Sequence, residues 1–321
     1  MKINRFAAFA WGVLVCALLV ILLGVVVRAT GSGAGCGSDW PSCNGQIVPS
    51  LEEMKTVIEF THRLTSSGFG LLAIALVVWG FREYPKGHRV RSAAVWSLVL
   101  TIVEGLIGAF LVRLELVADN ISVARAVWMA GHLANTFLLL GTFTLTAWWA
   151  SGGKSVRWRA QGAVIPLLGI GFALMMLLGM SGAITALGDT LFPANSLAEG
   201  LRQDFSDSAH FLIQLRTIHP VLAVLAGFYI VWAARQIAHL RPNLWTTRLS
   251  QALIGLFMLQ ILLGVVNLVL LAPIWMQLVH LLMADFVWMA FVLLGAAALA
   301  HDRVPIAPVG VGRSRSRVIG I

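Results

Sequence analysis

The chain has 321 residues, of which 59% are hydrophobic and only 12% are charged. A water-soluble globular protein of this length is excluded, because that composition leaves too few polar side chains to face water. The formal net charge of +9 is the kind of balance found in nucleic-acid-binding proteins. The basic residues nevertheless gather on one side of the predicted membrane spans, so we expect membrane orientation to explain the charge, and no nucleic-acid partner.

Eight apolar runs predict an all-α polytopic membrane protein. Each is about 20 residues or longer, enough for a helix to cross the hydrocarbon core of a bilayer. The first run resembles a signal peptide, but it is longer than the apolar part of one and no Ala-x-Ala site follows, so we interpret it as a retained span. The expected spans are residues 7–27, 57–81, 92–112, 125–149, 161–180, 209–234, 248–271 and 274–300.

The distribution of charge predicts the orientation of the chain. With the N-terminus in the cytoplasm, the inner segments hold most of the 23 Lys and Arg residues but only two of the 14 acids, Glu83 and Asp302. The positive-inside rule then places both termini in the cytoplasm, with the protein in the cell membrane. We interpret residues 305–321 as a basic cytoplasmic tail that faces lipid headgroups.

Two long connections are expected on the outer side, at about residues 28–56 and 181–208. The first is rich in Gly, Ser and Pro, which indicates a loop. It contains Cys36 and Cys43, seven positions apart in an oxidising compartment. We predict a disulfide between them, and the alternative is a thiol pair that takes part in redox chemistry.

An internal repeat relates the two halves of the chain. The corresponding histidines are His62 and His132 in the first half, and His219 and His280 in the second. They are 70 residues apart in the first half and 61 in the second. We therefore expect two duplicated four-helix bundles, residues 1–155 and 156–304, that run in the same direction.

The four histidines are expected at similar depth in the outer leaflet. The predicted helix starts are Ser50, spaced from Glu53 as a capping box, then Ser122, Ser208 and Pro273. In each half, two helices that run the same way can then supply two axial ligands to a flat metal macrocycle. Interhelical hydrogen bonding is the alternative, whereas a zinc or copper site more often adds Cys or carboxylate ligands. No Cys-x-x-Cys-His motif supports covalent haem attachment.

The duplicated sites differ in their charged neighbours. Glu59 stands three residues before the first histidine of its half, and Arg216 occupies the same place in the other half. A carboxylate there can act as acid, base or charge stabiliser, whereas a guanidinium suits a haem propionate. The alternative for Glu59 is a structural ion pair with Arg63 or Arg28.

Two further expectations concern side chains inside the spans. Glu104 lies within the third span and corresponds to the neutral Gln260, and both a bundle hydrogen bond and a role in the site are open for it. We also expect Glu59 and its neighbour His62 to face a cavity shared with His132.

Three runs resemble the haem A synthase family. They are Gly24-x-x-Val27-Arg28-Ala29-Thr30-Gly31-Ser32-Gly33, Trp40-Pro41-x-Cys43-x-Gly45 and Glu59-Phe60-Thr61-His62-Arg63. The similarity covers nearly the whole chain, with eight spans, two halves and four histidines in corresponding places. The Glu-x-x-His-Arg run together with the Cys-bearing loop is fairly specific, and the apolar helices alone are not.

The resemblance implies oxidation of haem O to haem A, in which a ring methyl is hydroxylated twice and then loses water to become a formyl group. Haem O is expected in the N-terminal half between His62 and His132, with Glu59 as the catalytic carboxylate. A b-type haem is the implied cofactor of the C-terminal half, bound by His219 and His280.

The resemblance also names further residues and partners. The candidate propionate partners are Arg28, Arg63 and Arg216, and part of the family has a loop disulfide at Cys36 and Cys43. The expected partners are haem O synthase, cytochrome oxidase assembly and a membrane electron acceptor, and a homo-oligomer is compatible with the chain. Two other classes remain: a diheme b-type membrane cytochrome that carries electrons without modifying haem, and a transporter, which lacks support because no clearly broken spans occupy matching positions.

Overall fold

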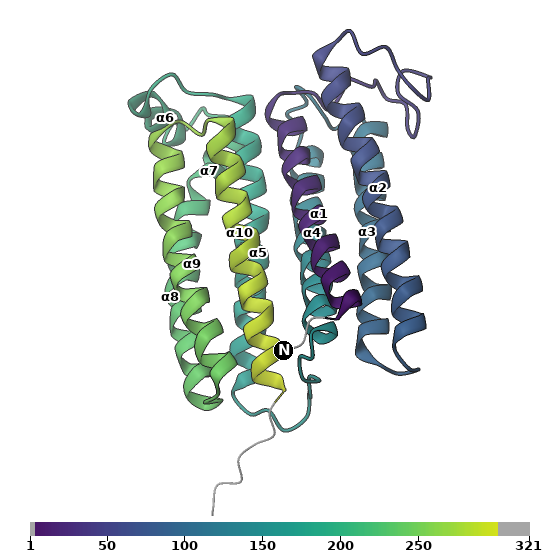
Figure 1. The fold of residues 1–321 in the computed structure, drawn as a ribbon. Coiled ribbons are helices and arrows are strands. Elements are labelled where there is room, and N and C mark those ends of the chain that lie inside the picture. The colour runs from purple at the N-terminus through teal and green to yellow at the C-terminus, as the bar shows by residue number, and fades with distance from the viewer. Residues whose placement is uncertain (1–3, 301–321) are drawn as a thin grey trace, which may run out of the picture.

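The computed structural model describes residues 4–300, and the predicted tail at 305–321 lies outside them. The described residues form ten helices (Figure 1). They are α1 (Arg5–Ala29), α2 (Met54–Glu83), α3 (Arg89–Arg113), α4 (Val123–Ala150), α5 (Val164–Leu191), α6 (Leu197–Asp204), α7 (Phe211–Arg216), α8 (Ile218–Leu240), α9 (Leu244–Val269) and α10 (Ile274–Leu299).

The predicted number of membrane spans is confirmed. Eight segments of the described chain are helical, long and apolar enough to cross a bilayer, and α7 and α8 together form one of them. The protein is therefore a multi-pass helical membrane protein. The start of α1 and the end of α10 lie at the same end of the molecule (Figure 1). We call the opposite end, which carries the α1–α2 and α5–α7 connections, the loop end.

Two of the four predicted helix starts are confirmed. Ser122 is the N-cap of α4, and its side chain accepts a hydrogen bond from the Arg125 N–H at 3.2 Å. Pro273 directly precedes α10. Its fixed φ suits the start of a helix, and its missing N–H leaves no helical bond unmade.

The other two predicted starts are wrong. Glu53 is the N-cap of α2 and makes no side-chain cap, so Ser50 lies outside the helix. His210, not Ser208, caps α7, and its ring nitrogen accepts a backbone N–H. Tertiary contacts override the local signal: the Thr56 hydroxyl in the first turn of α2, for example, donates to a carbonyl of the glycine-rich loop at 2.7 Å.

The fifth span is longer than predicted. It ends at Leu191 and not at residue 180, so part of the expected second outer loop is helical. Polar residues in this extension bond back to the helix, because the Ser181 hydroxyl donates to the Leu178 carbonyl and the Thr190 hydroxyl to the Ala186 carbonyl, both at 2.9 Å. The remaining connection contains the short helix α6.

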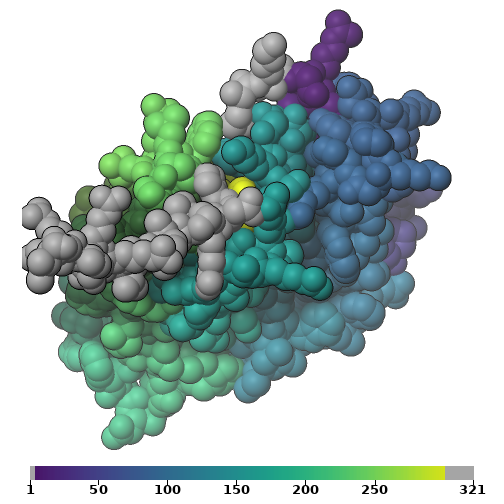
Figure 2. Space-filling view, turned by 90° about the horizontal axis from the view of Figure 1, so that it is seen from below, coloured from purple at the N-terminus to yellow at the C-terminus, as the bar shows by residue number. Residues whose placement is uncertain are grey.

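The spans form two groups (Figure 1). In the first, α1 packs against α2 and α4, and α3 packs against α2 and α4. In the second, α5, α8, α9 and α10 pack in the same pattern. The halves meet where α4 packs against α5 and α10, and α1 against α10. Seen from the end opposite the loop end, the last residues of α10 reach the surface in the middle of the molecule (Figure 2).

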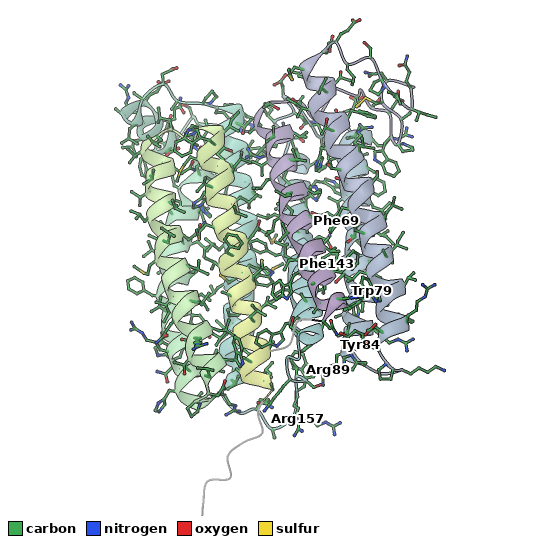
Figure 3. All side chains as sticks on the ribbon, in the orientation of Figure 1. Phe69, Trp79, Tyr84, Arg89, Phe143 and Arg157 are labelled. Atoms are coloured by element: carbon green, nitrogen blue, oxygen red, sulfur yellow. A yellow bond between two sulfur atoms is a disulfide. The ribbon has the colours of Figure 1, made fainter. Side chains whose placement is uncertain are left out.

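Aromatic residues fill the boundary between the halves and the core of the first half. Trp288 of α10 stacks on Phe137 of α4 with ring centroids 5.2 Å apart, and its indole N–H donates to the Phe137 carbonyl at 2.5 Å. Within the first half, Phe69 of α2 meets Phe143 of α4 at 5.3 Å (Figure 3).

The sixth span is interrupted at Thr217, between α7 and α8. Pro220 has no N–H to donate to the Arg216 carbonyl, which accounts for the interruption. The counterpart span, α2, is continuous from Met54 to Glu83. The halves therefore do not share a broken helix, and the feature expected of a repeat-built transporter is not present at these two positions.

Candidate functional site

The first histidine pair lies on α2 and α4. His62 and His132 are half-buried and within electrostatic range of each other. The His62 ring packs on α1 at Gly24, where an added Cβ would lie 3.2 Å from the ring Cε1. Its Nδ1 is buried without a hydrogen-bond partner in the described chain. His132 Nδ1 lies 3.1 Å from Glu104 Oε1 on α3.

The second pair lies on α8 and α10. His219 and His280 are also half-buried and within electrostatic range of each other. His219 packs on Gly182 of α5, and its Nδ1 is 2.9 Å from the Ser181 hydroxyl. His280 packs on Gly264 of α9, and its buried Nδ1 has no partner among residues 4–300.

Glycines lie beside three of the four rings, and the exception is His132, since Gly108, the counterpart of Gly264, has nothing within 4 Å. Gly24 and Gly182 occupy the same place in the first helix of each half, and Gly264 plays this part for His280 on α9. An added Cβ would press against the ring at 3.0–3.2 Å in each case. The imidazoles are therefore held close to neighbouring helices. Buried ring nitrogens without a protein partner indicate that a further group completes these sites.

Glu59 is directed at the glycine-rich loop. Its side chain is 3% exposed, and Oε2 accepts the Cys36 N–H at 2.8 Å. Oε1 accepts Nε and Nη2 of Arg63 at 3.1 and 2.5 Å. The structure thus contains the Arg63 ion pair that the sequence left as an alternative. Both carboxylate oxygens are engaged by the loop and by Arg63, and a cavity shared by Glu59, His62 and His132 stays a prediction.

The loop is fastened to α2 by the same arginine. Arg63 Nη1 donates to the carbonyls of Asp39 and Ser42, both at 2.7 Å. A disulfide between Cys36 and Cys43 closes this part of the loop. The loop, the arginine and its carboxylate partner therefore form one unit at the loop end. The second half has no cysteine and cannot repeat it.

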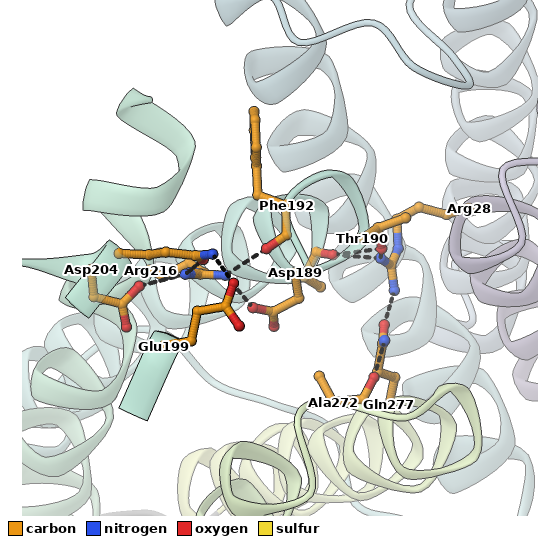
Figure 4. Close-up of polar contacts among 11 residues, drawn as sticks. Arg28, Asp189, Thr190, Phe192, Glu199, Asp204, Arg216, Ala272 and Gln277 are labelled. Carbon is orange, nitrogen blue, oxygen red and sulfur yellow. Dashed lines mark hydrogen bonds and ion pairs between the residues drawn. The ribbon is translucent and has the colours of Figure 1, made fainter. Parts of the chain in front are cut away.

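Arg28 leaves its own half and bonds to the other (Figure 4). From α1, its Nη1 donates to the Ala186 carbonyl at 2.7 Å and to the Thr190 hydroxyl at 2.6 Å, both on α5. Its Nη2 donates to Gln277 Oε1 on α10 at 2.6 Å. Arg28 is also within electrostatic range of Asp189. It therefore ties the two halves together at the loop end.

Arg216 uses all five of its N–H donors on protein acceptors (Figure 4). Nε and Nη2 donate to Asp204 Oδ1 at 2.9 and 2.6 Å, and Nη2 also reaches Gln203 Oε1 at 3.4 Å. Nη1 donates to Asp189 Oδ1 at 3.4 Å and to the Phe192 carbonyl at 3.3 Å. A haem propionate could therefore form an ion pair with Arg216 only by displacing one of these acceptors.

Glu104 makes the bundle hydrogen bonds that were one of the two alternatives for it, and it also lies next to His132. Its Oε2 accepts the Asn135 amide at 2.6 Å, and its Oε1 accepts the Thr136 hydroxyl, so it bonds α3 to α4. The same Oε1 is the atom next to His132. The sequence did not single out Asn135 or Thr136, although they follow the histidine by three and four residues and so share its helix face.

Asp285 was missed altogether. It lies in α10, is 0% exposed, and neither carboxylate oxygen has a partner in the described chain. The signal was available, since Asp285 is the only acid in the last apolar run and intramembrane acids are functional suspects.

Residues 7–292 match the COX15-CtaA family, described as cytochrome oxidase assembly protein. The chain belongs to this family. The match takes in all four site histidines, Glu59 and the cysteine loop. The COX15-CtaA chain therefore carries its histidine pairs within the region that defines the family.

The relatives of this COX15-CtaA protein carry two different names. Proteins named Protoheme IX farnesyltransferase from two strains of Thermus thermophilus are 50% identical over 296 residues, which is 92% of this chain and 49% of theirs. The chain thus spans about half the length of these relatives. Proteins named Heme A synthase from Bacillus cereus and Bacillus anthracis are 42% identical over 92 residues, 29% of this chain and 30% of theirs.

The site residues fit a haem. No group of three or more His, Cys, Asp or Glu in residues 4–300 is placed to hold a metal ion. A haem brings four nitrogen ligands of its own and needs only axial ligands, which a pair of imidazoles from two helices supplies. His219 and His280 have this arrangement, with one ring fixed by a hydroxyl and the other keeping an unpartnered ring nitrogen.

Proposed function

We propose that this COX15-CtaA protein is a haem A synthase, which oxidises a ring methyl of haem O to a formyl group. The observation that carries the proposal is a duplicated histidine pair with a carboxylate, Glu59, beside only one of the two. Membership of the family and the partial similarity to proteins named Heme A synthase support it.

The reaction defines what the protein needs. Two successive hydroxylations turn the methyl into a geminal diol, which loses water to leave the formyl group. With water as the oxygen donor, the net change releases four electrons and four protons from the substrate. The protein therefore needs a membrane electron acceptor and a group that receives protons near the reacting carbon.

We assign the substrate to the first half, residues 1–155, where His62 and His132 hold haem O. Glu59 is the proton-receiving group, at Oε2 once its contact with the Cys36 N–H is released. Arg63 holds the other oxygen and keeps the loop over the site, which excludes bulk water. Of the propionate candidates, Arg28 and Arg63 lie next to this half, and Arg216 lies beside the other.

We assign a resident haem b to the second half, residues 156–304, where His219 and His280 would hold its iron. When bound, it supplies one-electron redox chemistry between the substrate and the membrane acceptor. The neutral surroundings of this pair support a holding or electron-transfer role, because Arg216 is saturated by acids and Gln260 carries no charge.

The Thermus relatives support a haem O synthase as a functional partner of this protein. Their name describes farnesyl transfer to protohaem IX, the type of reaction that makes a farnesylated haem, and this chain accounts for only half of their length. We infer that a haem O synthase supplies the substrate directly to this protein. We also infer that the loop end is outside and both termini are cytoplasmic, as the positive-inside rule predicts.

The test is to co-express the chain with a haem O synthase and to identify the extracted haems by chromatography. We expect haem A to appear together with haem b. Glu59→Ala is expected to retain haem b and to stop haem A formation, whereas Glu52→Ala, an exposed acid of the same segment, is expected to behave as wild type.

Three results contradict the proposal. A folded, haem-loaded protein that never yields haem A is a diheme cytochrome b and not a synthase. Conversion of protohaem IX to haem O by the chain alone makes it a farnesyltransferase. A reduced-minus-oxidised spectrum without haem bands removes both haem assignments.

A further inference from the structure

We propose that Glu104 is a positioning residue that orients His132 and strengthens its imidazole as an iron ligand, in the first half only. The inference deepens the proposed function and rests on His132 being a ligand of haem O. It explains why Glu104, a carboxylate within a membrane span, is present although the proposed reaction steps do not use it.

The geometry places three side chains of one α4 face against one carboxylate of α3. His132, Asn135 and Thr136 stand at positions i, i+3 and i+4, so they project from the same side of the helix. Glu104 receives the Asn135 amide at 2.6 Å and the Thr136 hydroxyl, and its Oε1 is 3.1 Å from His132 Nδ1. This distance puts the carboxylate in direct contact with the ring, although Nδ1 makes no aligned hydrogen bond in the described chain, so the carboxylate acts on the imidazole through its nearby charge. The contact uses Nδ1 and leaves Nε2, on the far side of the ring, for a ligand.

The second half lacks this arrangement. Gln260 stands where the first half has Glu104, and the counterparts of Asn135 and Thr136 are Met283 and Ala284. The Gln260 amide nitrogen is 3.1 Å from Nε2 of its histidine, and the Nδ1 of that ring is buried without a partner in the described chain. The repeat therefore offers a built-in comparison between a charged and a neutral neighbour of a haem ligand.

A carboxylate behind a metal-bound imidazole has a known physical effect. It fixes the ring orientation and increases the basicity of the ligating nitrogen, and loss of such a partner typically costs 10–100-fold in metal affinity or activity. A more basic ligand stabilises ferric over ferrous iron, so it lowers the reduction potential of the haem. Glu104 therefore makes the first-half haem harder to reduce than it would be with a neutral neighbour.

The competing explanation is that Glu104 only bonds α3 to α4. Glu104→Gln separates the two, because its amide oxygen can still accept from Asn135 and its NH2 group can donate to the Thr136 hydroxyl, while the charge is lost. The Thr136 hydroxyl then donates its own proton to the His132 carbonyl, which lies at 3.0 Å. Thr136→Val is the matched control, since it removes a bond of the helix contact and leaves the carboxylate beside His132.

The experiment uses the chain with His280→Ala, co-expressed with a haem O synthase, so that only the first-half haem remains, and measures its midpoint potential by anaerobic redox titration. We expect Glu104→Gln to shift the ferric-to-ferrous equilibrium about tenfold toward ferrous, which is a rise of about 59 mV for one electron. We expect Thr136→Val to leave the potential unchanged. If His280→Ala does not fold, the chain with both haems is titrated, and Glu104→Gln must then move one of the two midpoints and leave the other.

An unchanged potential in Glu104→Gln, with or without a loss of stability, overturns the inference. An equal shift in Thr136→Val also overturns it, because the helix contact then sets the potential. Failure of the proposed function is separate and shows in haem content: a His280→Ala protein that still binds two haems contradicts the site assignment whatever the Glu104 variants do.

Discussion

Replacement of Arg216 by glutamine tests whether this arginine is mainly a structural centre or a partner of a haem propionate. In the structure its five donors are all bonded within the protein, and two of its partners are the carboxylates of Asp204 and Asp189. Arg216→Gln removes the cation that bonds to both acids at the loop end, although Asp189 keeps the more distant Arg28 within electrostatic range.

The size of the effect follows from burial. Removal of one partner of a buried ion pair costs about 3–5 kcal/mol, because the remaining charge stays uncompensated. The Arg216 side chain is 9% exposed, but those of Asp189 and Asp204 are 24% and 15% exposed and stay partly hydrated. We therefore expect the lower end of that range, about 3 kcal/mol of unfolding free energy.

The assay is denaturant unfolding of the haem-free protein in mild detergent, compared with Arg202→Gln. Arg202 is exposed on α6, so its replacement changes the net charge equally and should cost less than about 0.5 kcal/mol. If Arg216→Gln lowers the stability of the haem-free protein by less than about 1 kcal/mol but removes haem b, the structural explanation is refuted and the propionate role is favoured.

Three further predictions concern packing, burial and the loop. Gly24→Ala places a Cβ 3.2 Å from Cε1 of His62, so the ring must shift, and we expect roughly tenfold weaker haem O binding by spectral titration. Asp285→Ala removes a fully buried carboxyl without a partner and should stabilise the protein by about 1 kcal/mol in denaturant unfolding. Replacement of both Cys36 and Cys43 by serine removes a short cross-link and should cost about 2–3 kcal/mol in the same assay, without loss of haem b.

Matched variants control these measurements. Gly12→Ala introduces a methyl on α1 where nothing lies within 4 Å, so its haem O binding should equal that of wild type. Asp207→Ala removes an exposed acid and should leave stability unchanged, whereas a loss of stability in the Asp285 variant indicates that its carboxyl has a partner. Cys16→Ser tests serine replacement at the unpaired cysteine, and an equal effect there refutes the cross-link argument.

The number of spans and the proximity of the histidines within each pair were predictable because they depend on sequence patterns that extend along the whole chain. Each of the eight apolar runs must form a helix in the bilayer, because its backbone N–H and C=O groups have no water to bond to there. Matching histidines at the same depth in alternate spans must then lie on parallel helices of each half. The structure places His62 near His132, and His219 near His280, as this argument requires.

The details at the loop end were not predictable from local patterns. The end of α5 depends on side chains that bond back to its own carbonyls, and its polar composition resembles a loop. One partner of Glu59, the Cys36 N–H, comes from a loop more than 20 residues earlier in the chain. Arg28 bonds to groups 158, 162 and 249 residues away, which no spacing rule reaches.

The charges around the two histidine pairs indicate how a duplicated scaffold can divide its work. In the first half, Glu59 is balanced by Arg63, but Glu104 has no Lys or Arg partner in the described chain, so one carboxylate stands uncompensated beside His132. In the second half, Gln260 is neutral and Arg216 is balanced by acids. A fixed negative charge beside an iron ligand favours the more oxidised state of the iron. Under the proposed function, this charge lies in the half that would bind the haem to be oxidised, which agrees with the effect inferred for Glu104.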